Sequence, residues 1–222
     1  TSAAVQGITG EQIDTLETPE EITALGTDVA NLNTAALASL TSAQVAALTT
    51  EQIAALGSED VAALTSAAVT GLTSAQVAAL TTAQIPSLLT PQVAALTIDQ
   101  FDGITSAQLR SLTTGQLAAL TTDQIVALTT AQSAALTSAQ LAALTTAQIA
   151  AIQTEDLVGL SSAQIGSLTA AQVKALTTAQ IKMFTDTQVS QLTATQARAL
   201  STAQISQLTT AQVAAIETAD LV

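Results

Sequence analysis

The stretch Leu136–Ala143 reads LTSAQLAA, one copy of an eight-residue repeat that runs from Leu32 to Val222. With the places numbered from the leucine as zero, place zero recurs every eighth residue, and all 24 copies carry Leu, Ile or Phe there. Place five is a large apolar residue in 22 of the 24 copies, the exceptions being Ser133 and Ala197. Place four is Gln in 19 copies. Two apolar positions and one glutamine per octad therefore define the chain.

Neither a continuous helix nor a strand accommodates this period. Eight residues at about 100° each advance roughly 800°, so the apolar pair of a continuous helix would rotate by about 80° per copy and face no single neighbour. In a strand, places zero and five would point to opposite faces, and Ala and Gln are poor strand formers. The backbone must therefore bend once in every octad.

Helix capping explains the bend. When the N-cap is set at place one, which is usually Thr, the Gln at place four becomes N3 and completes a capping box. Places zero and five then become the two positions of a hydrophobic staple. Each octad is predicted to form a capped helix of about two turns, too short to be stable unless it stacks on its neighbours. The predicted fold is an all-α solenoid, a superhelix with one short helix per eight-residue repeat.

Departures from the consensus add detail to this prediction. In three copies place one cannot cap, and we expect the Thr at place two to cap instead. These pairs are Leu89 and Thr90, Gln153 and Thr154, and Glu217 and Thr218. Pro91 falls in a first helical turn, where a missing N–H costs little, whereas Pro86 lies at place six and predicts a shortened or kinked helix.

The composition suits a thin core rather than a globular one. The chain has 222 residues and only two aromatic side chains, Phe101 and Phe184, and much of its 48% hydrophobic content is Ala. A globular core of this size normally uses more large side chains. Together with the unbroken register, this predicts one continuous octad-repeat solenoid over residues 32–222.

Residues 1–31 are predicted to form an irregular acidic N-terminal cap on that solenoid. Apolar residues are unevenly spaced here, although Thr18, Pro19 and Glu21 still make a helix-capping motif. The segment holds six acidic residues, which are Glu11, Asp14, Glu17, Glu20, Glu21 and Asp28.

Three further features concern the continuity of the array. The sequence IDQFDG at 98–103 is the most divergent interior stretch, and its Phe101 and Gly103 suggest a bulge in the superhelix. The array stops at Val222 in mid-octad, which we interpret as truncation or as a surface that a partner covers. The chain also starts without Met or a signal peptide, as expected of a mature product or a piece of a longer protein.

The charge balance excludes several classes of partner. The chain has 17 acidic and four basic residues and a net charge of −13, which disfavours nucleic acid and anionic membranes. Cysteine is absent, so there is no disulfide framework and no thiolate metal site, and histidine is absent too. Thr and Gln interrupt every octad, so no apolar run approaches the roughly 18 residues of a membrane span. We expect no nucleic-acid binding, no membrane insertion and no cofactor.

The glutamine at place four allows two interpretations. It can complete the capping box within its own octad. It can also form a ladder of hydrogen bonds between stacked repeats or between chains. The two roles are compatible, and the sequence leaves both open.

Acidic residues replace this glutamine in three copies, at Asp60, Asp156 and Asp220. Glu59 and Glu155 precede the first two, and such a pair is a candidate Ca²⁺ site because Ca²⁺ takes several oxygen ligands. The alternative is that these acids complement the helix dipole in a first turn, and the absence of a Gly-rich calcium loop favours it.

No catalytic constellation stands out. There is no His or Cys and no Gly-rich phosphate loop, and the carboxylates occupy capping positions. A Ser–Lys dyad using Lys174 or Lys182 and an ice-binding array of the paired Thr and Ser hydroxyls are weaker alternatives. We therefore expect that the chain is not an enzyme.

Two resemblances follow from these motifs. LTSAQVAAL (Leu40–Leu48) resembles the opening helix of transcription-activator-like effector repeats, but the second helix and the base-reading loop of that family are missing. The octads over Leu32–Val222 resemble repeat tracts in very large secreted or surface adhesin-like proteins of Gram-negative bacteria. That resemblance implies an extracellular setting and a structural role, and no binding residue is carried over.

The sequence thus favours a structural protein of the bacterial cell exterior, either an elongated stalk or a filament subunit that associates end to end. The alternative is an adhesin or ligand-binding module that holds a glycan or protein on the concave face of the superhelix. The exposed places are monotonously Thr, Ser, Ala and Gln, whereas a binding face usually carries varied polar and aromatic residues. This favours the structural reading.

The staple makes a quantitative prediction. Leu144→Ala removes a place-zero side chain and should lower the free energy of unfolding by about 2–5 kcal/mol if the site is well packed. Chemical denaturation of the two proteins measures the difference. A variant that unfolds indistinguishably from the wild type would contradict the staple assignment.

Overall fold

The computed structural model describes residues 5–13, 15–16 and 18–219, and it gives them an all-helical fold. The α-helices have four to six residues, apart from a final helix of ten, and no strand occurs in these ranges. Six residues make about 1.7 turns, so the helices are somewhat shorter than the two turns that the sequence predicts. The predicted class, a helical repeat solenoid of short helices, is confirmed.

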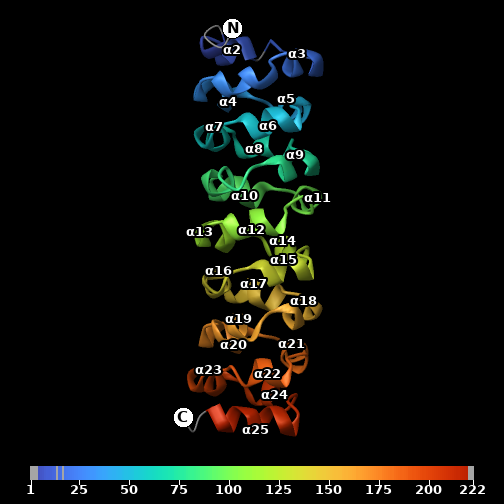
Figure 1. The fold of residues 1–222 in the computed structure, drawn as a ribbon, viewed down its shortest axis with the longest axis vertical. Helices are drawn as coiled ribbons and strands as arrows, with labels where there is room; N and C mark the ends of the chain where they lie inside the picture. The colour runs from blue at the N-terminus through green and yellow to red at the C-terminus, as the bar shows by residue number, and fades with distance from the viewer. Residues whose placement is uncertain (1–4, 14, 17, 220–222) are drawn as a thin grey trace. The chain divides into compact units, whose positions relative to one another are not determined.

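The chain divides into two compact units, unit 1 (residues 1–112) and unit 2 (residues 113–222). Unit 1 contains thirteen described elements (Figure 1). They are α2 (Gly10–Ile13), α3 (Pro19–Thr23), the 3₁₀ helix η1 (Gly26–Asn31), α4 (Thr34–Ser39), α5 (Ser42–Ala47), α6 (Thr50–Ala55), α7 (Ser58–Ala63), α8 (Ser66–Val69), α9 (Ser74–Ala79), the 3₁₀ helix η2 (Ile85–Ser87), α10 (Thr90–Ala95), α11 (Ile98–Phe101) and α12 (Ser106–Ser111).

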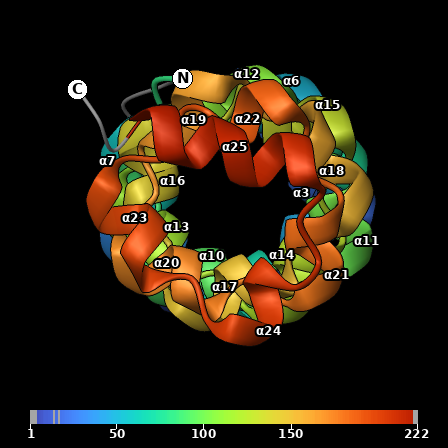
Figure 2. The same ribbon diagram turned by 90° about the horizontal axis from the view of Figure 1, so that it is seen from below.

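Unit 2 is built in the same way. Its elements are α13 (Thr114–Ala118), α14 (Thr122–Val126), α15 (Thr130–Ala135), α16 (Ser138–Ala143), α17 (Thr146–Ala151), α18 (Thr154–Gly159), α19 (Ser162–Gly166), α20 (Ala170–Ala175), α21 (Thr178–Lys182), α22 (Asp186–Val189), α23 (Ala194–Ala199), α24 (Thr202–Ile205) and α25 (Thr210–Ala219). Figure 2 views this unit from its C-terminal end, where α22, α23, α24 and α25 follow one another counterclockwise towards the viewer. The superhelix of unit 2 is therefore right-handed.

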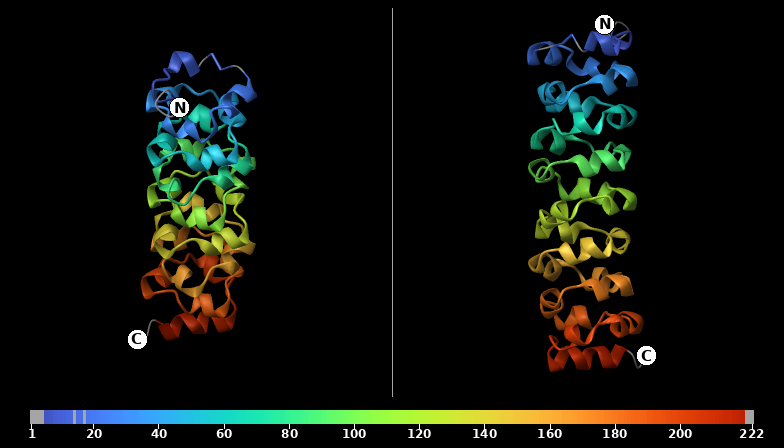
Figure 3. Two further views of the ribbon diagram at one scale, coloured as in Figure 1. Left: turned by 45° about the horizontal axis from the view of Figure 1, so that its top comes forward. Right: turned by 180° about the vertical axis from the view of Figure 1, so that it is seen from behind.

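Within each unit, a helix packs on the third element before it. In unit 1, α7 packs on α4 and α9 on α6, and in unit 2, α18 packs on α15 and α20 on α17. Figure 3 shows the resulting tiers of short helices. The three elements from residues 1–31 follow the same rule, because α2 packs on α4, α3 on α5 and η1 on α6. The predicted cap segment is thus stacked on the octads that follow it.

The backbone bends where the first two places of an octad are extended. In α20, the N-cap Thr169 has φ −72° and ψ 157°, and its side chain accepts a hydrogen bond from the backbone N–H of Gln172. At the other end, Leu176 at place zero has φ −56° and ψ 138°, so it stops the helix. The next residue, Thr177, is already the N-cap of α21. Only Leu176 therefore separates α20 from the N-cap of α21.

Places zero and five form the core. Place-five residues such as Val93 and Leu141 are fully buried, and place-zero residues such as Leu144 are nearly so. In unit 1, the side chains of Leu80, Leu88 and Leu96 converge with those of place five around a space of about 10 Å³. This is at the lower limit for one water molecule, so the interior is filled by the apolar pair of each octad.

The prolines behave as predicted. Pro86 lies in η2, where a 3₁₀ helix of three residues replaces the α-helix of the other octads. Pro91 stands in the first turn of α10, and Pro19 stands in the first turn of α3 after the N-cap Thr18. The loss of one N–H is therefore tolerated at helix starts, and it shortens the helix only at place six.

Two predicted caps are wrong. Leu89 and Gln153 remain the N-caps of α10 and α18 without a side-chain cap bond, so neither Thr90 nor Thr154 takes over. The register of the stack fixes where each helix starts, and it outweighs the local preference for a hydroxyl. At the third such copy, α25 continues through Glu217 without a new cap.

Close approach between turns explains the divergent stretch at 98–103. Phe101 is buried at place five as in other octads. A Cβ on Gly103 would overlap the backbone of Ser74, and one on Gly71 would overlap the carbonyl oxygen of Ser42 in the same way. The stretch therefore marks a point where two turns come close together.

Gly71 gives a test of this packing. Gly71→Ala puts a methyl group against the Ser42 backbone and should lower the free energy of unfolding by about 1–3 kcal/mol or more. Gly115→Ala is the matched control, because its Cβ would meet only the Thr113 hydroxyl at 4.0 Å. That change should be neutral or stabilise by up to about 1 kcal/mol. Equal effects of the two substitutions in thermal denaturation would disprove the close approach.

Candidate functional site

The buried glutamine at place four is the recurrent polar feature of the structure. All 19 glutamines at this place are between 1% and 8% exposed. A buried amide is costly unless its donors and acceptor are paired, so its hydrogen bonds determine what this position does.

The carbonyl half of the amide completes the capping box. In unit 2, Gln172 Oε1 accepts from the backbone N–H of Thr169 at 2.7 Å, and Gln148 Oε1 accepts from that of Thr145 at 2.7 Å. The bond forms even where place one is not a capping residue, because Gln92 Oε1 accepts from the N–H of Leu89 at 2.6 Å. The first predicted role of the glutamine is therefore confirmed.

The amino half of the same amide reaches the preceding turn. Gln172 Nε2 donates to the carbonyl oxygens of Leu141 at 2.8 Å and Leu144 at 2.7 Å. In unit 1, Gln108 Nε2 donates to those of Val77 at 2.8 Å and Leu80 at 2.6 Å. These acceptors lie 31 and 28 residues back, at the C-terminal end of the fourth helix before. The second predicted role, a ladder between stacked repeats, is confirmed within each unit.

The two halves together fix the geometry of the superhelix. A helix packs on the third helix before it, while its glutamine bonds to the end of the fourth, so one turn holds between three and four octads. The last carbonyls of a helix have no partner inside that helix, and here the next turn supplies one. The amide thus caps the start of one helix and the end of another.

The candidate calcium ligands lie in the first turns of two helices, Glu59 and Asp60 in α7 and Glu155 and Asp156 in α18. Asp60 in α7 accepts from the backbone N–H of Gly57 at 2.7 Å, so it caps its own helix. Asp156 in α18 is buried, whereas Glu59 and Glu155 are exposed. No three acidic side chains come together as metal ligands within the described parts of the chain. Asp220 lies outside the described residues, as do Asp14 and Glu17 of the N-terminal segment.

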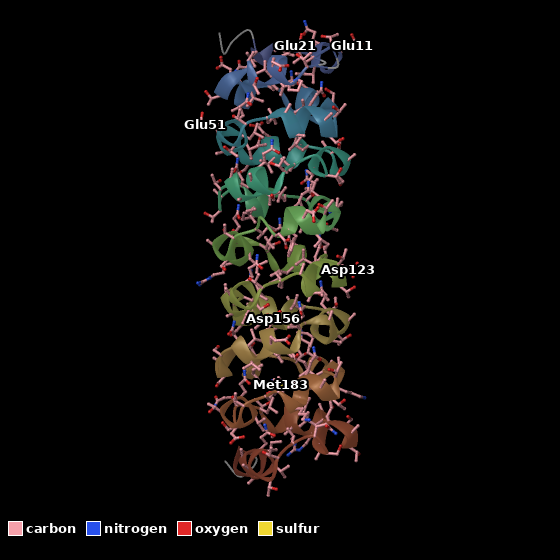
Figure 4. All side chains as sticks on the ribbon, turned by 90° about the vertical axis from the view of Figure 1, so that its right-hand side faces the viewer. Glu11, Glu21, Glu51, Asp123, Asp156 and Met183 are labelled. Atoms are coloured by element: carbon pink, nitrogen blue, oxygen red, sulfur yellow. The ribbon has the colours of Figure 1, made fainter. Side chains whose placement is uncertain are left out.

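Asp156 does not reproduce the glutamine bonds. Its Oδ1 accepts from Thr130 Oγ1 at 2.7 Å, and its Oδ2 is buried without a partner among the described residues. Burial raises the pKa of Asp156 above the ordinary aspartate value, the Thr130 hydrogen bond lowers it, and the charge of Glu155 raises it. Figure 4 marks its position in unit 2.

Gln153, at place one of the same octad, compensates in part. Its Nε2 donates to the carbonyl oxygen of Val126 at 2.6 Å, 27 residues back. A place-one side chain here supplies a bond to the preceding turn that place four cannot. Sequence alone marks Gln153 only as a residue that cannot cap, and its occurrence with Asp156 in one octad is the signal that could have indicated this role.

The remaining candidate groups are dispersed. Ser133 at place five is buried, and its hydroxyl has no partner among the described residues. Lys174 and Lys182 are exposed. The place-one hydroxyls serve as helix caps, as Thr145 does for the N–H of Gln148 at 3.2 Å. Among the described helices, none is long and apolar enough to cross a membrane.

Sequence comparison agrees with this repeat architecture. A model of the ALTTAQ repeat matches residues 22–58, 53–90, 93–130, 103–138 and 149–186, which together make up more than half of the chain. The chain belongs to the ALTTAQ repeat family. The six letters of that name occur literally at 79–84, 127–132, 143–148 and 175–180, where they run from place seven of one octad to the glutamine of the next.

Each match to the ALTTAQ repeat is longer than the 31 residues that separate a glutamine from its farthest acceptor. The match over residues 53–90, for example, contains Gln84 and both of its acceptors, the carbonyl oxygens of Ile53 and Leu56. No curated protein matches the chain in sequence.

A substitution of Gln172 distinguishes the two roles of the amide, which are the capping box and the bond to the preceding turn. Gln172→Glu keeps the acceptor for the Thr169 N–H but replaces the donor with an oxygen that faces the carbonyls of Leu141 and Leu144. We expect the free energy of unfolding at neutral pH to fall by about 1–3 kcal/mol or more. Gln191→Glu, the same change at an exposed position, is the control and should have an effect within about 0.5 kcal/mol. A Gln172 variant as stable as the control would show that capping alone accounts for the glutamine.

Proposed function

We propose that this ALTTAQ repeat chain is a structural protein of the bacterial cell exterior, a repeat stalk or a subunit of a self-assembling extracellular filament. The observation that supports the proposal most is the use of the buried amide. Within each unit, glutamines such as Gln108 and Gln172 join one turn to the next, so a unit can be extended by adding octads without any new kind of contact. A protein whose task is to span distance needs this property.

The surface is consistent with a scaffold. Places one, two, three, six and seven are mainly Thr, Ser and Ala, and exposed large apolar residues are scattered, as with Leu89, Val126 and Met183. Both aromatic residues, Phe101 and Phe184, are buried. Binding interfaces are enriched in aromatic side chains, so the alternative of an adhesin or ligand-binding module has less support.

Self-association is a part of the proposal. A second copy would bring the same donors and acceptors that the turns of one unit exchange, namely glutamine Nε2 and helix C-terminal carbonyl oxygens. A head-to-tail contact of this kind does not close on itself and generates a fibre. The net charge of −13 opposes association, and salt should weaken that repulsion.

Electron microscopy and sedimentation velocity over a concentration series test this proposal. We expect uniform filaments whose amount rises with protein concentration and with ionic strength, since salt screens the acidic chains from one another. The same series with Ca²⁺ added tests the calcium alternative at Glu59, Asp60, Glu155 and Asp156.

Single particles at every concentration and salt level would rule out the filament and leave the stalk. A glycan or peptide that binds the chain with micromolar or better affinity would instead support the ligand-binding alternative. Assembly only in the presence of Ca²⁺ would overturn the assignment of these acids to helix capping.

A further inference from the structure

In one octad of unit 2, a buried carboxyl group occupies the place where most octads have a hydrogen-bond donor. Asp156 is 3% exposed, and its Oδ2 lacks a hydrogen-bond partner among the described residues. In the octads with glutamine, the corresponding atom is an amino group that donates to the preceding turn. A buried polar oxygen without a partner costs free energy, and a buried unpaired charge costs more.

The register identifies the groups that this donor should reach. A place-four side chain faces the carbonyls 31 and 28 residues back, as Gln148 does with Leu117 and Leu120 at 2.8 Å each. For Asp156 these are the carbonyls of Ile125 and Leu128. No side-chain donor reaches either oxygen among the hydrogen bonds of the described residues. An ionised carboxylate cannot fill the role, because it only accepts, whereas a protonated carboxyl has one O–H to donate.

We propose that Asp156 is a proton-binding position of unit 2, where the protonated carboxyl group supplies the bond to the preceding turn that glutamine supplies in other octads. The proton would sit on Oδ2, while Oδ1 keeps its bond from the Thr130 hydroxyl at 2.7 Å. Acidification would then add a hydrogen bond from α18 to the C-terminal end of α14, and deprotonation would remove that bond. This goes beyond the structural role, because it makes one turn of the stack responsive to pH.

The charges around Asp156 favour the neutral form. α15, which packs against α18, carries no titratable residue, and α21 carries Lys182, which is exposed. Asp123 on α14 and Glu155 on α18 itself are exposed acids. The described neighbours therefore provide no buried cation to hold a carboxylate.

The direction of the pH dependence follows from burial. Burial raises the pKa of Asp156 in the folded protein above its value in the unfolded chain, and Glu155 adds to this while Thr130 opposes it. A raised folded-state pKa means that the protonated group stabilises the fold at low pH. This stabilisation is lost as the pH rises through the folded-state pKa.

Asp156→Asn tests the proposal, because an amide of the same size offers a donor and an acceptor at every pH. We expect the Tm values of wild type and variant to coincide near pH 3.5, where the carboxyl is protonated, and to diverge as the pH rises to about 8. The variant should be the more stable protein at neutral pH by a few degrees. Asp60→Asn is the matched control, since Asp60 occupies the same place but is not buried and caps Gly57. Its difference from wild type should not grow with pH in this way.

A direct titration of Asp156 in the wild-type chain tests the proposal without a substitution. Carboxyl-carbon NMR of the wild-type chain should show Asp156 titrating above the ordinary aspartate range. Titration at or below that range would overturn the proposal, as would a Tm difference between wild type and Asp156→Asn that is constant with pH. If Ca²⁺ raises the wild-type Tm at neutral pH but not that of Asp156→Asn, the group binds a cation rather than a proton and the proposal is also wrong.

Discussion

The primary amide of the place-four glutamine is the interaction on which the rest of the structure depends. Its oxygen accepts from the backbone at the start of its own helix, and its nitrogen donates to the end of a helix one turn earlier, as Gln172 does for Thr169, Leu141 and Leu144. No other uncharged side chain of this length has an acceptor and two donors on one rigid group. A glutamate would keep only the first bond. Among the shorter aspartates, Asp60 keeps the first bond, whereas Asp156 makes neither.

This interaction explains how helices of six residues or fewer can be stable. Such helices leave most of their terminal N–H and C=O groups unpaired, and they bury too little surface to form alone. Here the glutamine pairs the groups at both ends, and the apolar residues at places zero and five bury the remaining surface against the turns before and after. Every octad is therefore stabilised by its neighbours, and the irregular elements α2, α3 and η1 join the stack by the same contacts.

The use of polar side chains to stabilise the fold also bears on the function. Most polar side chains with a fixed position in the described structure serve the fold, as caps or as bonds between turns, and the two aromatic residues lie in the core. What remains exposed is small and uncharged over long stretches. A scaffold needs fewer specific contacts on its surface than a binding module does. The pattern of the repeat changes at Gln153 and Asp156, which share one octad, and Asp156 bonds to Thr130 of the preceding turn.

The sequence by itself determined the repeat, the cap at place one, the apolar pair and the effect of each proline, because all of these act over eight residues or fewer. It also limited the glutamine to two roles, a capping box and a ladder. Only the tertiary structure decided that both hold, because the acceptors lie 28 and 31 residues away and no local pattern encodes that distance. For the same reason the sequence did not predict that Leu89 and Gln153 stay at the cap position. It did not predict that Gly71 and Gly103 lie against the backbone of an earlier turn. It also did not predict that Asp156 is buried without a hydrogen-bond donor for its Oδ2. The number of octads per turn decides which residues meet, and it is set by how the side chains of successive turns pack together.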